Sequence, residues 1–379
     1  MYSESIIRYT NKYYLYGALF LEEKMKIGKL MSAILAIAIA TLSYACSTDE
    51  PIAPSEPGGT SRVRIGMSVD EWELSDKILE DAVLEGLDRI LADYEVKTQV
   101  MVSKASDQYE NNLDALAKEN DLVISAGLKM APLAARMSAK YPDRKFVIID
   151  GKVESPNVRS VEFRENEGAY LMGVIAGSMT KSGKVGFIGG MELPVTKRYQ
   201  AGFIAGVMSV NQEAGNLMIE GTMIKYSGSY TDSSKVRSLA GDLYSQGADI
   251  VMHAAGMSGE GLYEAAEDMG MLALGSERDE ALAYPEKAPV ILASVVKDAG
   301  MYAYDAVKDV LEGSFTQGLV SSGIKEGGIR ISDTLHPELE ANEELLELVH
   351  SVAGDIASET IIVPEDPEEL EAIYPANPE

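Results

Sequence analysis

Short apolar segments alternate with amphipathic helical segments along most of this chain, and this alternation constrains the fold more than any other feature. The first unit pairs a buried-strand pattern at 63–67 with Leu79, Val83, Leu87 and Ile90 at helical spacing. Strands that alternate with helices form βαβ units, which require parallel strands and right-handed crossovers. We therefore predict an α/β protein.

The alternation continues in two consecutive blocks, which a chain of 379 residues can accommodate as two domains. The expected strands lie at 63–67, 96–102, 122–125, 146–149, 159–163, 184–188, 218–224, 250–253, 272–275 and 290–294. The expected helices lie at 76–94, 109–120, 130–141, 166–179, 197–211, 231–246, 259–269 and 297–312. Two such blocks predict two doubly wound, Rossmann-like lobes. Ligands of open parallel sheets bind beyond the carboxyl ends of the strands, so the loops there should form a site between the lobes.

Composition excludes several classes of function. The formal net charge of −27 is unsuited to binding nucleic acid, which needs a basic face. A single Cys excludes an internal disulfide, a CxxC pair and a cysteine-based zinc cluster, and three His leave little for a histidine metal site. The chain has no G-x-S-x-G, Walker A or HExxH sequence. We expect no enzymatic activity, no metal and no cofactor.

The N-terminal segment has the pattern of a secretory signal. A basic stretch from Met25 to Lys29 precedes thirteen uncharged residues at 30–42, which span about 20 Å as a helix and are too short for a bilayer core of about 30 Å. Cys46 follows directly, where a bacterial lipoprotein carries its lipidated cysteine. Ala45 fits that pattern, whereas Ser43 and Tyr44 depart from it. A plain cleaved signal with an incidental Cys46 is the alternative.

The residues after Cys46 predict a flexible tether. Residues 47–61 contain three Pro and two Gly. Removing residues 1–45 removes five basic and three acidic residues, so the mature chain carries a formal charge of −29. Like charge would keep this body off an anionic membrane, while acyl chains on Cys46 hold it there. The expected location is the bacterial cell envelope, lipid-anchored, and either periplasmic or surface-exposed.

The loops carry a series of recognisable phrases in a fixed order. They include Ile148-Ile149-Asp150, Glu167-Gly168-Ala169-Tyr170-Leu171, Gly186-Phe187-Ile188-Gly189-Gly190, Gly228-Ser229-Tyr230-Thr231-Asp232, Gln246-Gly247-Ala248-Asp249 and Ser294-Val295-Val296-Lys297. Over residues 63–333 their order and spacing resemble the basic membrane protein family of bacterial solute-binding lipoproteins. The best-studied members of that family bind purine nucleosides for ABC transporters.

This resemblance implies the fold of a type I periplasmic binding protein, in which a hinge joins two lobes and the chain crosses near Phe163, Ser294 and Gly318. The implied organisation is a signal peptide at 1–45 (with Met25 as a possible true start), a lipidated tether at 46–61, lobe 1 at 62–163, lobe 2 at 164–293, a return to lobe 1 at 294–318, and a return to lobe 2 with an acidic tail at 319–379. The implied partners are a small-molecule ligand, such as a purine nucleoside, and an ABC permease. We expect a monomer.

The resemblance also implies which residues contact the ligand. Tyr230 takes the place of an aromatic residue that stacks on the base, and Asp150 that of a carboxylate that contacts the ribose. Lys297 follows the Ser-Val-Val phrase, and Gly256 would let backbone approach the ligand. Glu277 takes the place of a carboxylate that reads the base edge.

Departures from the family pattern leave it open whether the ligand is a nucleoside. The usual Phe and Asn of the first motif, which includes Asp76, are Leu79 and Glu80 here, so Trp72 in the same loop would have to supply the missing ring. Glu277 is one methylene longer than the usual Asp, and Arg278 places a guanidinium beside it. The alternative function is therefore a surface-displayed binding or sensing lipoprotein for another polar ligand, such as a sugar or a cationic metabolite.

Several of these residues also have structural interpretations. Lys297 could form a hinge salt bridge, Asp150 could cap a strand end, and Ser75 or Asp76 could cap the first helix. His253 is expected to be a satisfied core histidine. The acidic stretches 338–347 and 365–371 are expected to form solvated helix faces.

Overall fold

The computed structural model describes residues 63–70 and 77–374. The expected signal segment, Cys46, Trp72 and Asp76 lie outside these residues, so the predictions made for them remain predictions.

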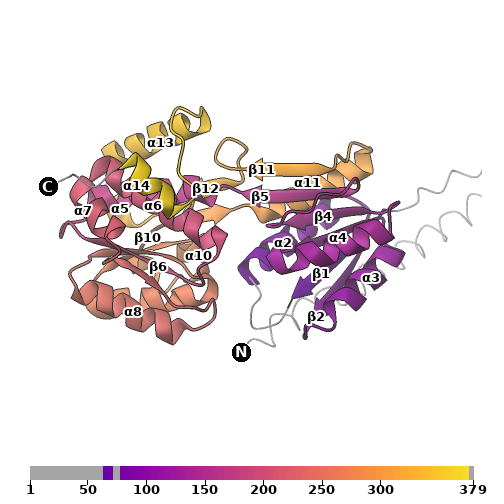
Figure 1. The fold of residues 1–379 in the computed structure, drawn as a ribbon, viewed down its shortest axis with the longest axis horizontal. Coiled ribbons are helices and arrows are strands. Elements are labelled where there is room, and N and C mark those ends of the chain that lie inside the picture. Colours follow the sequence, from indigo (N-terminus) through magenta and orange to yellow (C-terminus); the bar gives the residue numbers. More distant parts are fainter. Residues whose placement is uncertain (1–62, 71–76, 375–379) are drawn as a thin grey trace, which may run out of the picture. The chain divides into compact units, whose positions relative to one another are not determined.

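The first sheet has six parallel strands in the order β11-β5-β4-β3-β1-β2 (Figure 1). Its strands are β1 (Arg64–Asp70), β2 (Lys97–Ser103), β3 (Leu122–Ala126), β4 (Lys145–Ile149), β5 (Val158–Phe163) and β11 (Gly318–Ser322). The helices packed with it are α2 (Lys77–Asp93), α3 (Tyr109–Glu119), η2 (Leu128–Met130), α4 (Ala131–Lys140) and α11 (Ala299–Glu312). We call this sheet and its helices lobe 1.

The second sheet repeats this order as β12-β10-β9-β8-β6-β7, with only β12 antiparallel to its neighbour. Its strands are β6 (Val185–Gly189), β7 (Ile224–Tyr226), β8 (Ile250–Ala254), β9 (Leu272–Gly275), β10 (Ile291–Lys297) and β12 (Ile329–Ile331). The helices around it are α5 (Glu165–Met179), α6 (Pro194–Val210), α7 (Gln212–Ile219), α8 (Ser233–Ser245), η3 (Gly256–Gly259), α9 (Glu260–Met269), α10 (Glu280–Ala283), η4 (Ala288–Val290), α12 (Pro337–Glu340), α13 (Glu343–Ala357) and α14 (Pro367–Ile373). We call this lobe 2. Both sheets have the doubly wound order in which ligands bind where the strand order reverses.

Beyond its polar first turn, helix α5 is apolar on all sides because protein surrounds it. Its residues from Glu165 to Gly177 are all buried, between the second sheet, α6 and α13. A Cβ at Gly206 of α6 would lie 2.0 Å from the carbonyl oxygen of Tyr170, so only glycine permits this spacing. The two helices therefore run close together from their first turns, which positions polar residues of both near β10.

Within the part of the chain that the structure describes, the backbone passes between the sheets three times, and two of these crossings differ from the expected boundaries. The first follows Phe163, as expected. Residues 294–318 were assigned to lobe 1 and residues 319–379 to lobe 2. However, β10 pairs with β12 as far as Lys297, and β11 pairs with β5 as far as Ser322. The second and third crossings therefore begin only after Lys297 and Ser322, where this strand pairing ends.

One expected strand is wrong. Residues 218–224 were predicted as a strand, but Met218 and Ile219 end helix α7, and β7 begins only at Ile224. Asn211 starts this helix, because its side chain accepts a hydrogen bond from the backbone N–H of Ala214. Met218 is buried as part of this helix. The apolar residues at 218–219, which resemble the start of a strand, therefore pack as the end of a helix instead.

The acidic C-terminal part is anchored to lobe 2 by one face. Leu345, Val349 and Ile356 of α13 and Leu370 of α14 are buried, while Glu343, Glu344 and Glu347 of α13 are exposed. This agrees with the expected solvated helix face. The helices pack against α5 and α6, so they also enclose the core behind the site described below.

Candidate ligand-binding site

Lys297, the last residue of β10, is surrounded by three carboxylates. Its Nζ lies 3.3 Å from Oδ2 of Asp150, 3.1 Å from Oε1 of Glu165 and 3.0 Å from Oε2 of Glu277. Asp150 follows β4 of lobe 1, whereas Glu277 follows β9 of lobe 2. The structure thus brings together three of the predicted site residues, at the carboxyl edges of both sheets and next to a crossing.

Two of these carboxylates stand on strained backbone. Asp150 has φ 59° and Glu277 has φ 73°, in the left-handed region that favours glycine. Such a conformation costs about 1–2 kcal/mol for a residue with a Cβ. The backbone N–H of Lys297 donates to the carbonyl of Glu277 at 3.0 Å and helps to hold this turn. Strain of this kind is retained where the direction of a side chain matters.

Two residues of α6 pair with two of these carboxylates. Nε of Arg198 lies 2.7 Å from Oε2 of Glu165, and the hydroxyl of Tyr199 donates to Oε1 of Glu277 at 2.9 Å. Sequence reasoning missed Glu165, Arg198 and Tyr199. A usable signal was present: Glu165 is a charged residue in the polar first turn of a helix that is apolar beyond it.

Burial and charge together fix the ionisation of this cluster. Burial alone would lower the pKa of Lys297, but Asp150, Glu277 and Glu165 raise it well above its usual value. Burial alone would raise the pKa of Glu165, but Lys297 and Arg198 hold it below its usual range. Burial and the nearby Glu277 raise the pKa of Tyr199, which stays a neutral donor.

Exposure separates the carboxylates into two kinds. The side chain of Glu165 is 0% exposed and that of Lys297 2%, whereas Asp150 retains 14% and Glu277 10%. Asp150 and Glu277 can therefore still accept hydrogen bonds from a small molecule. Glu165 can act only through its neighbours.

Tyr230 lies in the loop after β7, and glycine shapes its surroundings. A Cβ at Gly190 would lie 2.3 Å from Cε1 of the Tyr230 ring, so the ring packs directly on bare backbone. Gly256, with φ 54°, lies against the same side chain. The hydroxyls of Tyr230 and Thr196 share a hydrogen bond of 2.8 Å. Thr196 is two residues before Arg198 and three before Tyr199 on α6, so this helix links the ring to the charge cluster.

The other predicted contacts lie in less open positions. Leu79 and Glu80, in the first turn of α2, are 3% and 5% exposed, and Leu79 belongs to the hydrophobic core. Arg278 turns toward its own lobe: its Nε lies 3.5 Å from Oε1 of Glu280, and its guanidinium lies 5.2 Å from the centre of the Tyr284 ring. Ligand contact by Leu79 and Glu80 stays a prediction.

His253 is a buried core residue, as predicted. It is 0% exposed, and its Nε2 lies 2.7 Å from the hydroxyl of Tyr263. Burial, helped by the charge of Arg278, lowers its pKa to about 3, so it is neutral. Burial also raises the pKa of the neighbouring Glu280 to about 8, despite the opposing effect of Arg278.

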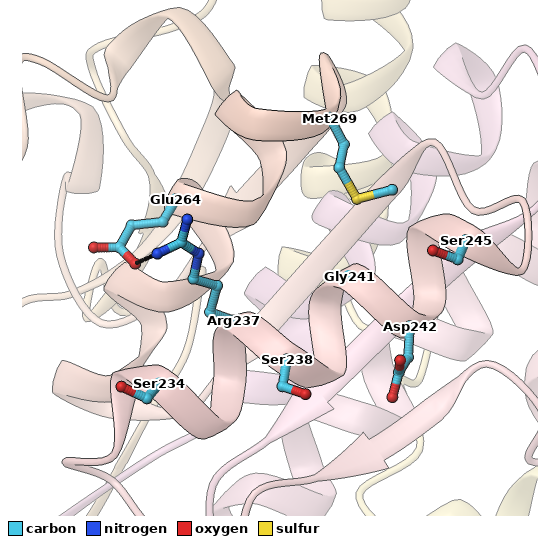
Figure 2. A pocket seen from close by; sticks show the side chains of 8 residues that line it. All are labelled: Ser234, Arg237, Ser238, Gly241, Asp242, Ser245, Glu264 and Met269. Atoms are coloured by element: carbon cyan, nitrogen blue, oxygen red, sulfur yellow. Dashed lines mark ion pairs between the residues drawn. The ribbon is translucent and has the colours of Figure 1, made fainter.

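Figure 2 shows a pocket elsewhere on lobe 2, between α8 and α9. Ser234, Ser238 and Gly241 line it from α8, and Arg237 is already paired with Glu264 at 3.3 Å. A second pocket includes Arg64 and Asn120 of lobe 1. Neither pocket contains a predicted site residue.

Within residues 63–70 and 77–374, no three His, Cys, Asp or Glu side chains are grouped so that they could hold a metal ion. No helix there has both the length and the apolar character needed to cross a bilayer.

Comparison with known proteins decides the family. Residues 63–366 match the model of the family described as ABC transporter substrate-binding protein PnrA-like. This chain belongs to that family. The expected resemblance and the two-lobed fold are thereby confirmed, and the protein is an ABC transporter substrate-binding protein. Membership implies a small-molecule ligand and an ABC permease as partner.

Relatives of this PnrA-like protein cover most of its length. Basic membrane protein A of Borreliella burgdorferi is 27% identical, over 91% of this chain and 98% of the relative. A protein of Lactococcus lactis named ABC transporter nucleoside-binding protein BmpA is 26% identical, over 89% of this chain and 99% of its own. An ABC solute-binding protein structure from Aeropyrum pernix superposes with a TM-score of 0.67 at 24% identity, over 82% of this chain and 96% of the other, which supports the fold.

Proposed function

We propose that this PnrA-like protein captures a neutral, hydroxyl-rich small molecule of the nucleoside class between its two lobes and delivers it to its ABC permease. The observation that carries the proposal is the Lys297 cluster, which places two partly exposed carboxylates, Asp150 and Glu277, at the carboxyl edges of both sheets.

The chemistry of the cluster suits such a ligand. The hydroxyls of a ribose diol can donate to the carboxylate of Asp150, and a base edge that carries N–H groups can donate to Glu277. Tyr230 offers an aromatic ring for stacking on a base. Its ring is held from behind by Gly190, and Gly256 allows backbone to approach the ligand. The name of the Lactococcus lactis relative, a nucleoside-binding protein, agrees with this class.

We further propose that Cys46 carries the membrane anchor outside the cytoplasm. The relatives named basic membrane protein, and one from Pyrococcus horikoshii named uncharacterized lipoprotein, support an anchored protein. Metabolic labelling with a fatty acid, followed by fractionation, tests this. Wild type should be labelled and sediment with membranes, and Cys46→Ser should lose the label. Label retained on Cys46→Ser would contradict the anchor.

Calorimetry tests the ligand class. The detergent-purified full chain, freed of bound metabolites by denaturation and refolding, is titrated with adenosine, guanosine, inosine, cytidine and uridine. We expect saturable heat with at least one nucleoside, and its loss in Asp150→Asn. No heat with any of the five would contradict the nucleoside class. Mass spectrometry of the released metabolites would then identify a sugar or cationic ligand, in agreement with the alternative function.

A further inference from the structure

Arg198 presents more of its surface than the accessible carboxylates of the Lys297 cluster. Its side chain is 20% exposed, whereas those of Asp150 and Glu277 are 14% and 10% exposed. Arg198 lies in the second turn of α6, and its Nε is 2.7 Å from Oε2 of Glu165. The rest of the guanidinium therefore has surface that a small molecule can reach.

Arg198 also holds hydrogen-bond donors that the protein leaves unused. A guanidinium carries five N–H groups, and the one on Nε donates to Glu165. In the part of the chain that the structure describes, neither Nη1 nor Nη2 of Arg198 makes a hydrogen bond. The N–H groups of both Nη atoms are thus available to an acceptor on a ligand.

The other donors of the cluster are already occupied. The side chain of Lys297 is 2% exposed, and its Nζ lies 3.0 to 3.3 Å from oxygens of three carboxylates. The hydroxyl of Tyr199 donates to Glu277, and Tyr199 is 1% exposed. The accessible carboxylates can only accept. Among these side chains, Arg198 alone can donate to a ligand.

The unused donors lie near the carboxylate that we propose to hold the ribose. Burial alone would lower the pKa of Arg198, but Glu165 raises it, and the charge of Asp150 adds to this rise. Glu165 also faces Lys297, which in turn contacts Asp150. One carboxylate and one ammonium thus connect the guanidinium to Asp150. A ribose hydroxyl can donate to a carboxylate and accept from a guanidinium at the same time.

We infer that Arg198 is a specificity-determining residue that contacts the ligand directly and donates to its ribose diol, opposite Asp150. The inference rests on the proposed function, since it concerns the same site. Asp150 accepts from a hydroxyl, and Nη1 or Nη2 of Arg198 donates to an oxygen of the same diol. The two residues together therefore select a ligand with adjacent hydroxyl groups.

Deoxynucleosides test this contact. Calorimetry with wild type first identifies which of the five nucleosides binds most tightly. That ribonucleoside and its 2′-deoxy and 3′-deoxy forms are the probes. Each deoxy form lacks one of the two hydroxyls, so the hydroxyl that Arg198 contacts is absent from one of them.

Arg198→Lys separates the contact from the charge. It keeps a positive charge for Glu165 but loses the planar fork that carries the Nη donors. We expect it to weaken binding of the ribonucleoside about tenfold, the loss of one hydrogen bond to a charged group. Binding of at least one deoxy form should be weakened much less, because that form has no hydroxyl for Arg198 to contact. The preference of wild type for the ribonucleoside over that form should fall accordingly.

The matched control is Arg159→Lys, the same replacement at a buried arginine that pairs with Asp309 of lobe 1 at 2.8 Å. It should leave the preference for the ribonucleoside over both deoxy forms unchanged. Circular dichroism of each variant checks that it is folded. Because Arg198→Lys retains the cation beside Glu165, it tests the contact without exposing that carboxylate to the loss of its partner.

Two results would overturn the inference and leave the proposed function intact. One is unchanged affinity of Arg198→Lys for the ribonucleoside. The other is equal weakening of the ribonucleoside and both deoxy forms, which would give Arg198 a structural role alone. Absence of heat with all five nucleosides in wild type would instead overturn the proposed function, and the inference with it.

Discussion

Nζ of Lys297 lies 3.3 Å from Oδ2 of Asp150, and this ion pair joins the last residue of a lobe 2 strand to the end of a lobe 1 strand. The structural interpretation of Lys297 as an interlobe salt bridge is therefore confirmed. The functional interpretation is compatible with it, because Asp150 keeps part of its surface. Under the proposed function, binding and lobe contact use the same carboxylate, so a ligand at Asp150 would act directly on the ion pair next to the crossing.

Replacing Lys297 by Met should destabilise the protein strongly. It leaves three carboxylates close together without their shared cation, and such a loss costs about 3–5 kcal/mol. Urea unfolding followed by circular dichroism measures this. The matched control is Lys325→Met, whose pair with Glu359 lies in solvent and should contribute little to stability. Equal effects of the two variants would contradict the central role of Lys297.

Substitutions of Tyr230 should separate its ring from its hydroxyl. Tyr230→Phe keeps the ring and loses the bond to Thr196, so nucleoside affinity should change little and stability should fall by about 1 kcal/mol. Tyr230→Ala removes the ring and should weaken nucleoside binding by about 1–3 kcal/mol, the range of a base–aromatic stack. Calorimetry measures both. Equal affinity of the Phe and Ala variants would exclude stacking.

Stability should fall as the pH rises toward 8 because of Glu280. Its folded-state pKa of about 8 lies above the value of 4.5 in an unfolded chain, so the folded state binds the extra proton between these values. The stability that this proton provides is fully present below pH 4.5 and is lost as the pH rises through 8. His253 has the opposite effect, because its folded-state pKa of about 3 lies below its ordinary value of 6.5. The stability that its neutral form provides is present above pH 6.5 and is lost as the pH falls through 3.

Urea unfolding of wild type and Glu280→Gln between pH 6.5 and 8 isolates Glu280 from His253. The Gln variant keeps the shape of the neutral side chain but cannot lose a proton. Its free energy of unfolding should therefore fall less than that of wild type between pH 6.5 and 8. Parallel pH profiles for the two proteins would show that Glu280 does not hold a proton in the folded state.

Arg164 should control the stiffness of the crossings. Its Nε lies 2.5 Å from Glu167 and Nη2 lies 2.5 Å from Glu326, while Nη1 donates to the carbonyl of Ser321 at 3.1 Å. These bonds join the first crossing to the third. Arg164→Met should broaden the distribution of distances between spin labels at positions 104 and 235, in a Cys46→Ser background. An unchanged distribution would contradict a hinge role.

The sequence predicted the order of strands and helices well, because the spacing of apolar residues within each segment is a local property of the chain. Its errors arose where local pattern is ambiguous. Met218 and Ile219 have the composition of a strand, yet the Asn211 cap starts a helix there. The short strands β11 and β12 were not predicted, since they are defined by pairing with β5 and β10, which are far away in sequence.

The candidate site was predictable only in part. Asp150, Glu277 and Lys297 were found through the resemblance, and the structure gives them one shared contact. Glu165 and Arg198 are 33 positions apart, and their meeting depends on the close approach of α5 and α6 that Gly206 permits. No single-sequence pattern encodes that distance.

The sequence by itself determined the alternating elements, the two-block organisation and the family. These follow from the spacing of apolar residues and the order of the family's motifs, which can both be read from the sequence alone. The tertiary structure alone decided which charges meet. Burial around Lys297 excludes water, so the ionisation of Glu165 and the direction of Asp150 follow from neighbours that packing supplies rather than from adjacent residues.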